Sequence, residues 1–129
     1  MDHYEFLGRV RDALRVAALE DADRAVYATL ETLGERITGG EAANLASQLP
    51  FETGYYLRKG LSSGESFDVD EFFRRVARRE GVDPAIASAH ARVVLRVVND
   101  VVSPGLVEHV KAQLPDEFDR LFQPGGVTR

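Results

Sequence analysis

One short string occurs twice in the sequence and limits how the chain can fold. Gln-Leu-Pro-x-Glu stands at residues 48–52 and again at 113–117, 65 positions apart in a chain of 129 residues, and each copy follows an apolar run with helical spacing. Proline lacks an amide hydrogen and disfavours helical angles in the residue before it, so a helix must end at each leucine. Pro50 and Pro115 therefore predict corners from which a new short helix begins.

Two helices are predicted to start in the same way, one in each half of the chain. Asp2 with Glu5, and Asp68 with Glu71, have the spacing of a capping box. In such a box the first side chain accepts from the N3 amide, and the second carboxylate returns to the N-cap amide. The string Glu-Phe-x-x-Arg-Val follows from both glutamates. Apolar residues three and four positions apart then predict an amphipathic helix after each box.

A longer helix is predicted next in each half. Residues 21–37 keep helical spacing for about four turns. Residues 83–102 begin with Asp-Pro, an N-cap followed by a proline suited to the first helical position. The valine-rich part of this second segment would also allow a strand by propensity, but its apolar residues come in pairs separated by one or two polar ones. We therefore expect a helix there, and we expect it to be the most buried element.

Each long helix is predicted to end in a turn of small residues, at 38–40 and 103–105. Shorter amphipathic runs follow and lead into the Leu-Pro corners. The sequence thus predicts an all-α protein made of two tandem, pseudo-symmetric four-helix repeats that pack as one helical bundle domain. The expected divisions are repeat 1 over 1–60, a linker over 61–67, repeat 2 over 68–124 and a flexible tail over 125–129.

Composition and charge argue against several classes of protein. A chain with 44% hydrophobic residues can bury a core of its own, and the absence of cysteine rules out disulfides and thiolate metal sites. No segment has the apolar length of a signal peptide or a membrane span, so we expect a cytoplasmic protein with no membrane partner. The net charge of −5 is spread evenly over both halves, which argues against a nucleic-acid partner.

The histidines are the first candidates for chemistry. None of His3, His90 and His109 has the spacing of a metal-ligand pair on one helix. His90 is expected near the apolar face of the second long helix and His109 on the short helix after it, so the two could meet as metal ligands or as an acid–base pair. Histidines on the surfaces of separate helices are the plainer interpretation. Without catalytic or phosphate-loop spacing elsewhere, we expect no enzyme activity and no cofactor.

An arginine run lies in the second half, at residues 74, 75, 78 and 79. Its helical spacing gathers these charges, with Glu71 available for pairing within the helix. We interpret the run as a solvated outer face, and an anion-binding site is the alternative. DNA binding by a helix-turn-helix over residues 21–49 is a further alternative, but the second helix of that pair has no basic residue to contact phosphate.

Aromatic residues distinguish the two short helices that follow the prolines. Phe51, Tyr55 and Tyr56 in the first copy align with an aspartate, an arginine and a leucine in the second. A requirement common to both repeats cannot explain this excess, so the three aromatic residues are predicted to form an interaction surface. Packing against the other repeat or against the linker is the alternative.

Several of these strings together resemble a known family. Leu-x-x-Arg-Ile-Thr-Gly-Gly-Glu at 33–41, Leu-Ala-x-Gln-Leu-Pro at 45–50 and Phe-Asp-x-Asp-Glu-Phe-x-x-Arg-Val-Ala at 67–77 are similar to the small bacterial and archaeal family catalogued as domain of unknown function 2267. The resemblance covers nearly the whole chain. It implies a soluble, all-helical prokaryotic protein and brings no catalytic or ligand residues to this sequence. Phe-Glu-Thr-Gly-Tyr-Tyr at 51–56 departs from the family pattern, so inferences from its tyrosines concern this sequence alone.

Two functions are compatible with these features. The lack of catalytic spacing and the aromatic excess favour a non-enzymatic protein-interaction or self-association module, whose partner is another protein or a second copy of the chain. The alternative is a small-ligand or metal-binding helical protein that uses the groove between the repeats, with His90 and His109 as candidate ligands.

Overall fold

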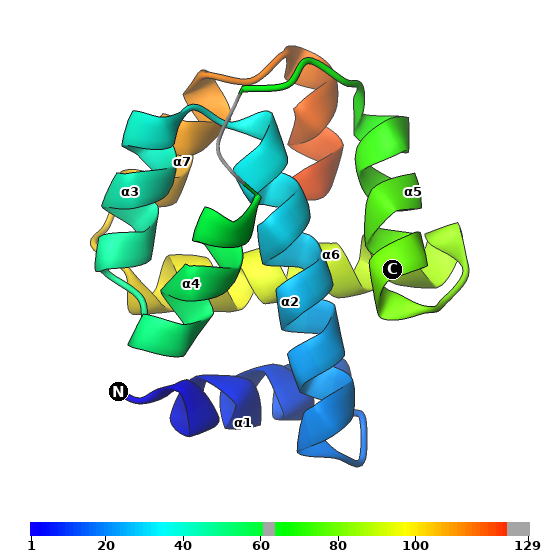
Figure 1. The fold of residues 1–129 in the computed structure, drawn as a ribbon. Coiled ribbons are helices and arrows are strands. Elements are labelled where there is room, and N and C mark those ends of the chain that lie inside the picture. The colour runs from blue at the N-terminus through cyan, green and yellow to red at the C-terminus, as the bar shows by residue number, and fades with distance from the viewer. Residues whose placement is uncertain (61–63, 124–129) are drawn as a thin grey trace.

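The computed structural model describes residues 1–60 and 64–123, and these residues form a bundle of helices without a β-strand (Figure 1). The predicted all-α fold is therefore confirmed. Residues 61–63 of the predicted linker and the predicted tail over 125–129 lie outside the described residues. The helices are α1 (His3–Leu14), α2 (Leu19–Arg36), α3 (Gly39–Ser47), α4 (Phe51–Lys59), α5 (Val69–Glu80), α6 (Pro84–Val101), α7 (Leu106–Ala112) and the 3-10 helix η1 (Asp116–Leu121).

The N-terminal caps of α1 and α5 differ in one hydrogen bond. Asp2 accepts from the amide of Glu5 at 2.8 Å, and the Glu5 carboxylate accepts from the amide of Asp2 at 3.0 Å. At α5, Asp68 accepts from the amide of Glu71 at 2.8 Å, but the Glu71 carboxylate accepts from arginine side chains instead. Arg74 and Arg75 compete with the N-cap amide for Glu71, whereas at α1 a glycine, Gly8, stands at the position of Arg74.

Each proline of the repeated string stands immediately before a helix. Pro50 is the N-cap residue of α4, and Pro115 is the N-cap residue of η1, both with extended ψ angles. The amide of Gly54 donates to the Pro50 carbonyl at 2.9 Å, which closes the first turn of an α-helix. After Pro115 it is the amide of Phe118 that donates to the proline carbonyl, so the second copy makes tighter 3-10 turns.

The core is organised around the two long helices, α2 and α6, which cross in the middle of the molecule (Figure 1). The valine-rich segment is helical, as expected, and Val94 and Val98 are fully buried. The expectation that this segment is the most buried element is wrong, because α2 has more buried residues than α6. The reason is packing: α1, α4, α5 and α6 all contact α2, so only a narrow stripe of it meets solvent.

Helices of each half of the chain pack against helices of the other half across the core. Helix α1 packs against α2 and also against α6, and α5 packs against α6 and also against α2. Helices α3 and α7 meet as well. The lengths of α1 and α5 agree at 12 residues, and those of α2 and α6 agree at 18. These pairings fit the predicted tandem repeat, which stays a prediction.

Within residues 1–60 and 64–123, no helix combines the length and the apolar character that crossing a lipid bilayer requires.

Candidate functional site

The outer face of α4 carries two exposed aromatic side chains. Phe51 is 84% exposed and Tyr55 is 53% exposed, and because they are four positions apart they lie on the same face of the helix. The opposite face of α4 is buried through Thr53, Gly54 and Leu57. Packing therefore uses one side of this helix and leaves the aromatic side to solvent, which is costly for apolar surface.

The start of α1, which contacts α4, also carries exposed apolar side chains. Tyr4 is 70% exposed and Met1 is 51% exposed. The start of α1 is fixed to α4 because His3 Nδ1 lies 2.7 Å from Thr53 Oγ1, and Figure 1 shows the two helix ends beside each other. We call this surface the aromatic patch, and it consists of Met1, Tyr4, Phe51 and Tyr55. Among the large hydrophobic side chains exposed in the described parts of the chain, Ile86 alone lies elsewhere.

The third predicted aromatic, Tyr56, has a different position. Its hydroxyl donates to Asp23 of α2 at 2.7 Å, and its ring stands edge-on to the rings of His3 and Tyr27 at 5.5 Å. Burial, with a smaller contribution from the Asp23 carboxylate, raises the pKa of Tyr56 well above its ordinary value. The phenol therefore remains a hydrogen-bond donor and joins α4 to α2, apart from the aromatic patch.

His3 is a connecting residue that sequence reasoning did not single out. Besides its contact with Thr53, its Nε2 lies 3.5 Å from Asp23 Oδ1, so one buried imidazole joins α1, α2 and α4. The position directly after the Asp2 N-cap gives no sequence signal for this role. The acceptor and the hydroxyl come from residues 20 and 50 positions away.

The charges on the exposed face of α4 are separated by sign. Glu52 lies in its first turn, and Arg58 and Lys59 lie in its last turn, all three exposed. This order suits the helix dipole, which favours acids at the N-terminus and bases at the C-terminus. Lys59 Nζ also lies 5.1 Å from the centre of the Tyr27 ring. The aromatic patch is thus flanked by negative charge at one end of α4 and by positive charge at the other.

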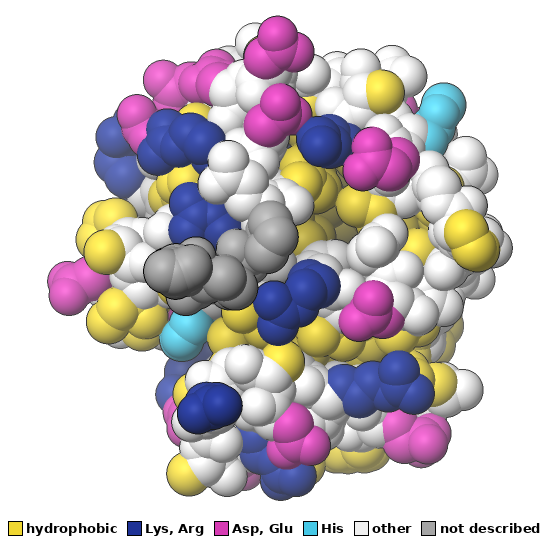
Figure 2. Space-filling view, turned by 180° about the vertical axis from the view of Figure 1, so that it is seen from behind, with side chains coloured by type: hydrophobic (Ala, Val, Ile, Leu, Met, Phe, Trp, Pro, Cys, Tyr) yellow, Lys and Arg dark blue, Asp and Glu magenta, His cyan; other side chains and the backbone are white. Residues whose placement is uncertain are grey.

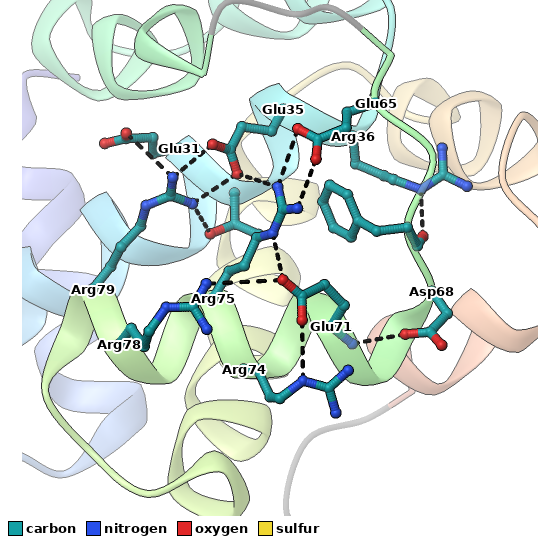
Figure 3. A network of polar contacts seen from close by, with 12 residues as sticks. Glu31, Glu35, Arg36, Glu65, Asp68, Glu71, Arg74, Arg75, Arg78 and Arg79 are labelled. Atoms are coloured by element: carbon teal, nitrogen blue, oxygen red, sulfur yellow. Dashed lines mark hydrogen bonds and ion pairs between the residues drawn. The ribbon is translucent and has the colours of Figure 1, made fainter.

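The arginine run of α5 forms a network with acids of α2 and of the segment before α5 (Figure 3). Arg79 donates to both oxygens of Glu35, at 2.9 and 2.7 Å, and to Thr32 Oγ1 at 2.6 Å. Arg75 donates to Glu35 at 3.1 Å and to Glu65 at 2.6 Å. The interpretation of the whole run as a solvated outer face is wrong for Arg75 and Arg79, whose side chains are 17% and 22% exposed.

The other two arginines of the run remain outside. Arg74 Nε donates to Glu71 at 3.0 Å, and Arg78 lies 3.8 Å from the same carboxylate.

The hydrogen bond from Arg79, together with that from Arg75, lowers the pKa of Glu35 below its ordinary value of 4.5 despite partial burial. The network therefore holds its carboxylates ionised at neutral pH and joins α2 to α5. Its arginines are occupied by these acids, which leaves the anion-site alternative without support from Arg75 and Arg79.

The two histidines proposed as ligands have separate neighbours. His90 Nδ1 is in hydrogen-bond contact with Glu80 of α5, whose side chain is 5% exposed. His109 is exposed on α7 and close enough to Glu41 of α3 for its charge to oppose the rise in the pKa of Glu41 that burial causes. In the portion of the chain that the structure describes, no three His, Cys, Asp or Glu side chains are grouped as a metal ion would require.

Comparison with known proteins places the chain in a family. The family model described as "Uncharacterized conserved protein (DUF2267)" matches residues 3–121. The matched range begins with α1 and ends with η1, so it includes every helix of the bundle. No curated protein matches the chain.

Proposed function

This chain belongs to the DUF2267 family, and we propose that it functions as a self-association module in which two copies pair through α4. The observation that carries this proposal is the aromatic patch. Exposed apolar side chains that gather in one place are typical of protein–protein contact surfaces, and Tyr and Phe are enriched in the buried centres of such contacts. Within this bundle, Phe51 at 84% exposure gains nothing from the fold that it could not gain from a smaller residue.

The charge order along α4 favours a second copy as the partner. In a symmetric dimer the same surface occurs on both sides, so a residue of one copy faces its counterpart across a two-fold axis. With two α4 helices antiparallel and the axis near Tyr55, Glu52 of one copy lies opposite Arg58 of the other. Phe51 lies opposite Lys59, where an ammonium group can contact the face of an aromatic ring. Both flanking charges then meet opposite charges, and the surface is complementary to itself.

A charge exchange tests the predicted pairing. Glu52→Arg alone places like charges opposite each other, and so does Arg58→Glu alone, so each variant is expected to weaken the dimer at least tenfold. The charge-exchanged variant with both substitutions restores opposite charges, keeps Lys59 opposite Phe51 and is expected to recover most of the affinity. The measurement is sedimentation equilibrium over a concentration series at low salt, because screening weakens exposed charge pairs. A charge-exchanged variant that stays monomeric beside a dimeric wild type would contradict the antiparallel arrangement.

A second comparison tests the aromatic patch itself. Removing both rings with Phe51→Ala and Tyr55→Ala is expected to abolish association at concentrations where the wild type is dimeric, because aromatic anchors dominate small interfaces. Ile86→Ala is the matched control, since Ile86 is an exposed hydrophobic residue outside the patch. A strictly monomeric wild type, or a control that dissociates as the double variant does, would remove the proposal.

A further inference from the structure

A second surface of the molecule is hollow and apolar. A groove with a volume of about 460 Å³ runs between the end of α1 and the first half of α6. Figure 2 shows hydrophobic side chains in the hollow between α1, at the bottom of that view, and the body above it. Volumes of about 300–1,000 Å³ are common for small-molecule sites. The apolar side chains that line it are Ala13, Leu14, Ala85, Ile86, Ala89 and Val93.

One polar side chain also lines this groove, and it is His90. Its Nδ1 atom contacts Glu80 Oε2, and no hydrogen bond joins its Nε2 atom to any other described residue. Glu80 is buried, and its second oxygen, Oε1, has no hydrogen-bond partner among the described residues. An apolar groove with a single polar group suits a ligand that is apolar apart from one polar end.

The buried position of Glu80 determines which hydrogen-bonding role His90 can offer. A buried carboxylate with one unsatisfied oxygen is costly as a lone negative charge, and this favours the two arrangements in which Glu80 and His90 are neutral as a pair, with one proton beyond the single hydrogen of a neutral ring. That proton can lie on the imidazole, and then both ring nitrogens carry hydrogen. It can also lie on Glu80 and be donated to Nδ1, and then the neutral ring carries its hydrogen on Nε2. In both of these neutral arrangements Nε2–H is a donor, whereas Nε2 would accept if Nδ1–H donated to an ionised Glu80; the head group that binds distinguishes the two.

From this geometry we propose that the groove between α1 and α6 binds a small apolar molecule through a hydrogen-bond-accepting head group, with the His90 Nε2–H as donor and Glu80 as its support. The shared chemistry is a carboxylate or carbonyl oxygen at the end of a hydrocarbon body. The hydrocarbon contacts Leu14, Ile86 and Val93, and the oxygen accepts from Nε2. This ligand site is separate from the aromatic patch and does not depend on self-association.

A metal ion suits the same groove less well. A metal ion bound through His90 would take Nε2 without its hydrogen while Nδ1–H donates to Glu80, but one histidine is a single ligand and metal sites need several. The groove lining contains no second His, Cys, Asp or Glu among the described residues. An organic acceptor uses the hydrogen that the Glu80–His90 pair already places on Nε2.

The probes for this site are decanoate and decylammonium, which share a hydrocarbon chain and differ at the head. Decanoate accepts a hydrogen bond, whereas decylammonium only donates. Titration calorimetry below the concentrations at which either forms micelles is expected to show saturable binding of decanoate and at least tenfold weaker binding of decylammonium. Methyl decanoate distinguishes the two acceptor classes: comparable binding assigns a carbonyl, and loss of binding assigns a carboxylate. Either of these results supports the site, whereas no saturable binding of either acceptor overturns it.

Two variants locate the binding. Ala89→Phe fills the groove without changing the histidine and is expected to weaken decanoate binding at least tenfold. Ala43→Phe is the matched control because Ala43 is exposed on α3, away from the groove, and it is expected to bind as the wild type does. Equal binding by the wild type and Ala89→Phe would overturn the proposal.

The role of His90 has its own test. Replacing the pair together, with Glu80→Leu and His90→Phe, avoids leaving a buried charge without a partner. This double variant is expected to lose the preference for decanoate over decylammonium. A measurement on the wild type does not depend on whether the double variant folds. In NMR spectra, the side-chain nitrogen signals of His90 are expected to shift on titration with decanoate, while those of His109 stay unchanged. An unmoved His90 signal at saturation would refute its part in binding.

Discussion

At the scale of single residues, a glycine determines how closely α4 can approach α2. A Cβ atom at Gly34 would collide with the backbone carbonyl oxygen of Leu57. A Cβ at Gly60 would likewise meet the backbone of α2, and one at Gly54 would lie 2.7 Å from the Ala46 carbonyl oxygen. The absence of side chains at these positions lets α4 pack on α2 and α3 with its backbone in contact. This fixes the direction in which Phe51 and Tyr55 point.

Alanine substitutions at two glycines should have opposite effects on stability. Gly34→Ala is expected to lower the free energy of unfolding by about 2–3 kcal/mol, because the neighbouring backbone has no room for a methyl group. Gly8→Ala in α1 is expected to raise it by about 0.5–1 kcal/mol, since nothing lies within 4 Å of the added carbon and alanine favours a helix. Urea denaturation of both variants measures the difference. Similar values would show that α4 does not pack this closely.

The tyrosines show what residue type alone can and cannot reveal. Tyr55 and Tyr56 are adjacent in the sequence, and because both are tyrosines they were given the same predicted role. The structure separates them because adjacent residues point about 100° apart on a helix, and Asp23 on α2 lies where the Tyr56 hydroxyl can reach it. A wheel drawn for α4 would have separated the two residues, but the carboxylate that binds Tyr56 comes from another helix.

At the scale of helices, local sequence signals predicted where the helices begin and end, but they did not predict correctly which side chains face solvent. Caps, prolines and glycines act within a few residues, so the predicted starts and ends lie close to those observed. The inward position of Arg75 and Arg79 depends on Glu35, which is 40 and 44 residues away in the sequence. Nothing within α5 shows that its arginines face an acidic stripe on α2.

The joint between α2 and α5 should depend on pH through Glu35. The pKa of this carboxyl is lower in the folded protein than its ordinary value of 4.5, so its stabilising contribution is present above that pH and is lost as pH falls through the folded value. Glu35→Gln is therefore expected to lower the free energy of unfolding by about 1.5–3 kcal/mol at pH 7 and by much less at pH 3. Urea denaturation at both values measures this.

A control accompanies that experiment. Glu108→Gln changes an exposed glutamate in the first turn of α7 and is expected to change stability by less than about 0.5 kcal/mol at either pH. If Glu35→Gln differs from the wild type by the same amount at pH 7 and pH 3, then ionisation of Glu35 does not stabilise the joint.

At the scale of the whole molecule, the halves depend on each other. Helix α1 buries Phe6 and Val10 in a core that includes α6, and α5 buries Phe72 and Val76 in a core that includes α2. Each half thus completes its core with a helix of the other. The predicted repeats are units of sequence, and these contacts indicate that neither half has a complete core of its own.

Separated halves are expected not to fold alone. Residues 1–63 and residues 64–129, prepared as two peptides, should each show low helical content and no cooperative unfolding, because each exposes the apolar surface that its partner covers. Mixed in equal amounts, they should recover helical circular dichroism. A first peptide that unfolds cooperatively by itself, with the helicity of α1 to α4, would show that the halves are independent.

The sequence alone determined the class of fold, the order of the helices and most of their ends, because periodicity, caps and prolines act over distances of a few residues. It also pointed to the aromatic residues that α4 presents. Only the tertiary structure decided that Tyr56 and two of the arginines face inward, and that His90 pairs with a buried Glu80 beside an apolar groove. These outcomes depend on which helices meet across the core, and contacts between residues tens of positions apart leave no trace in local patterns.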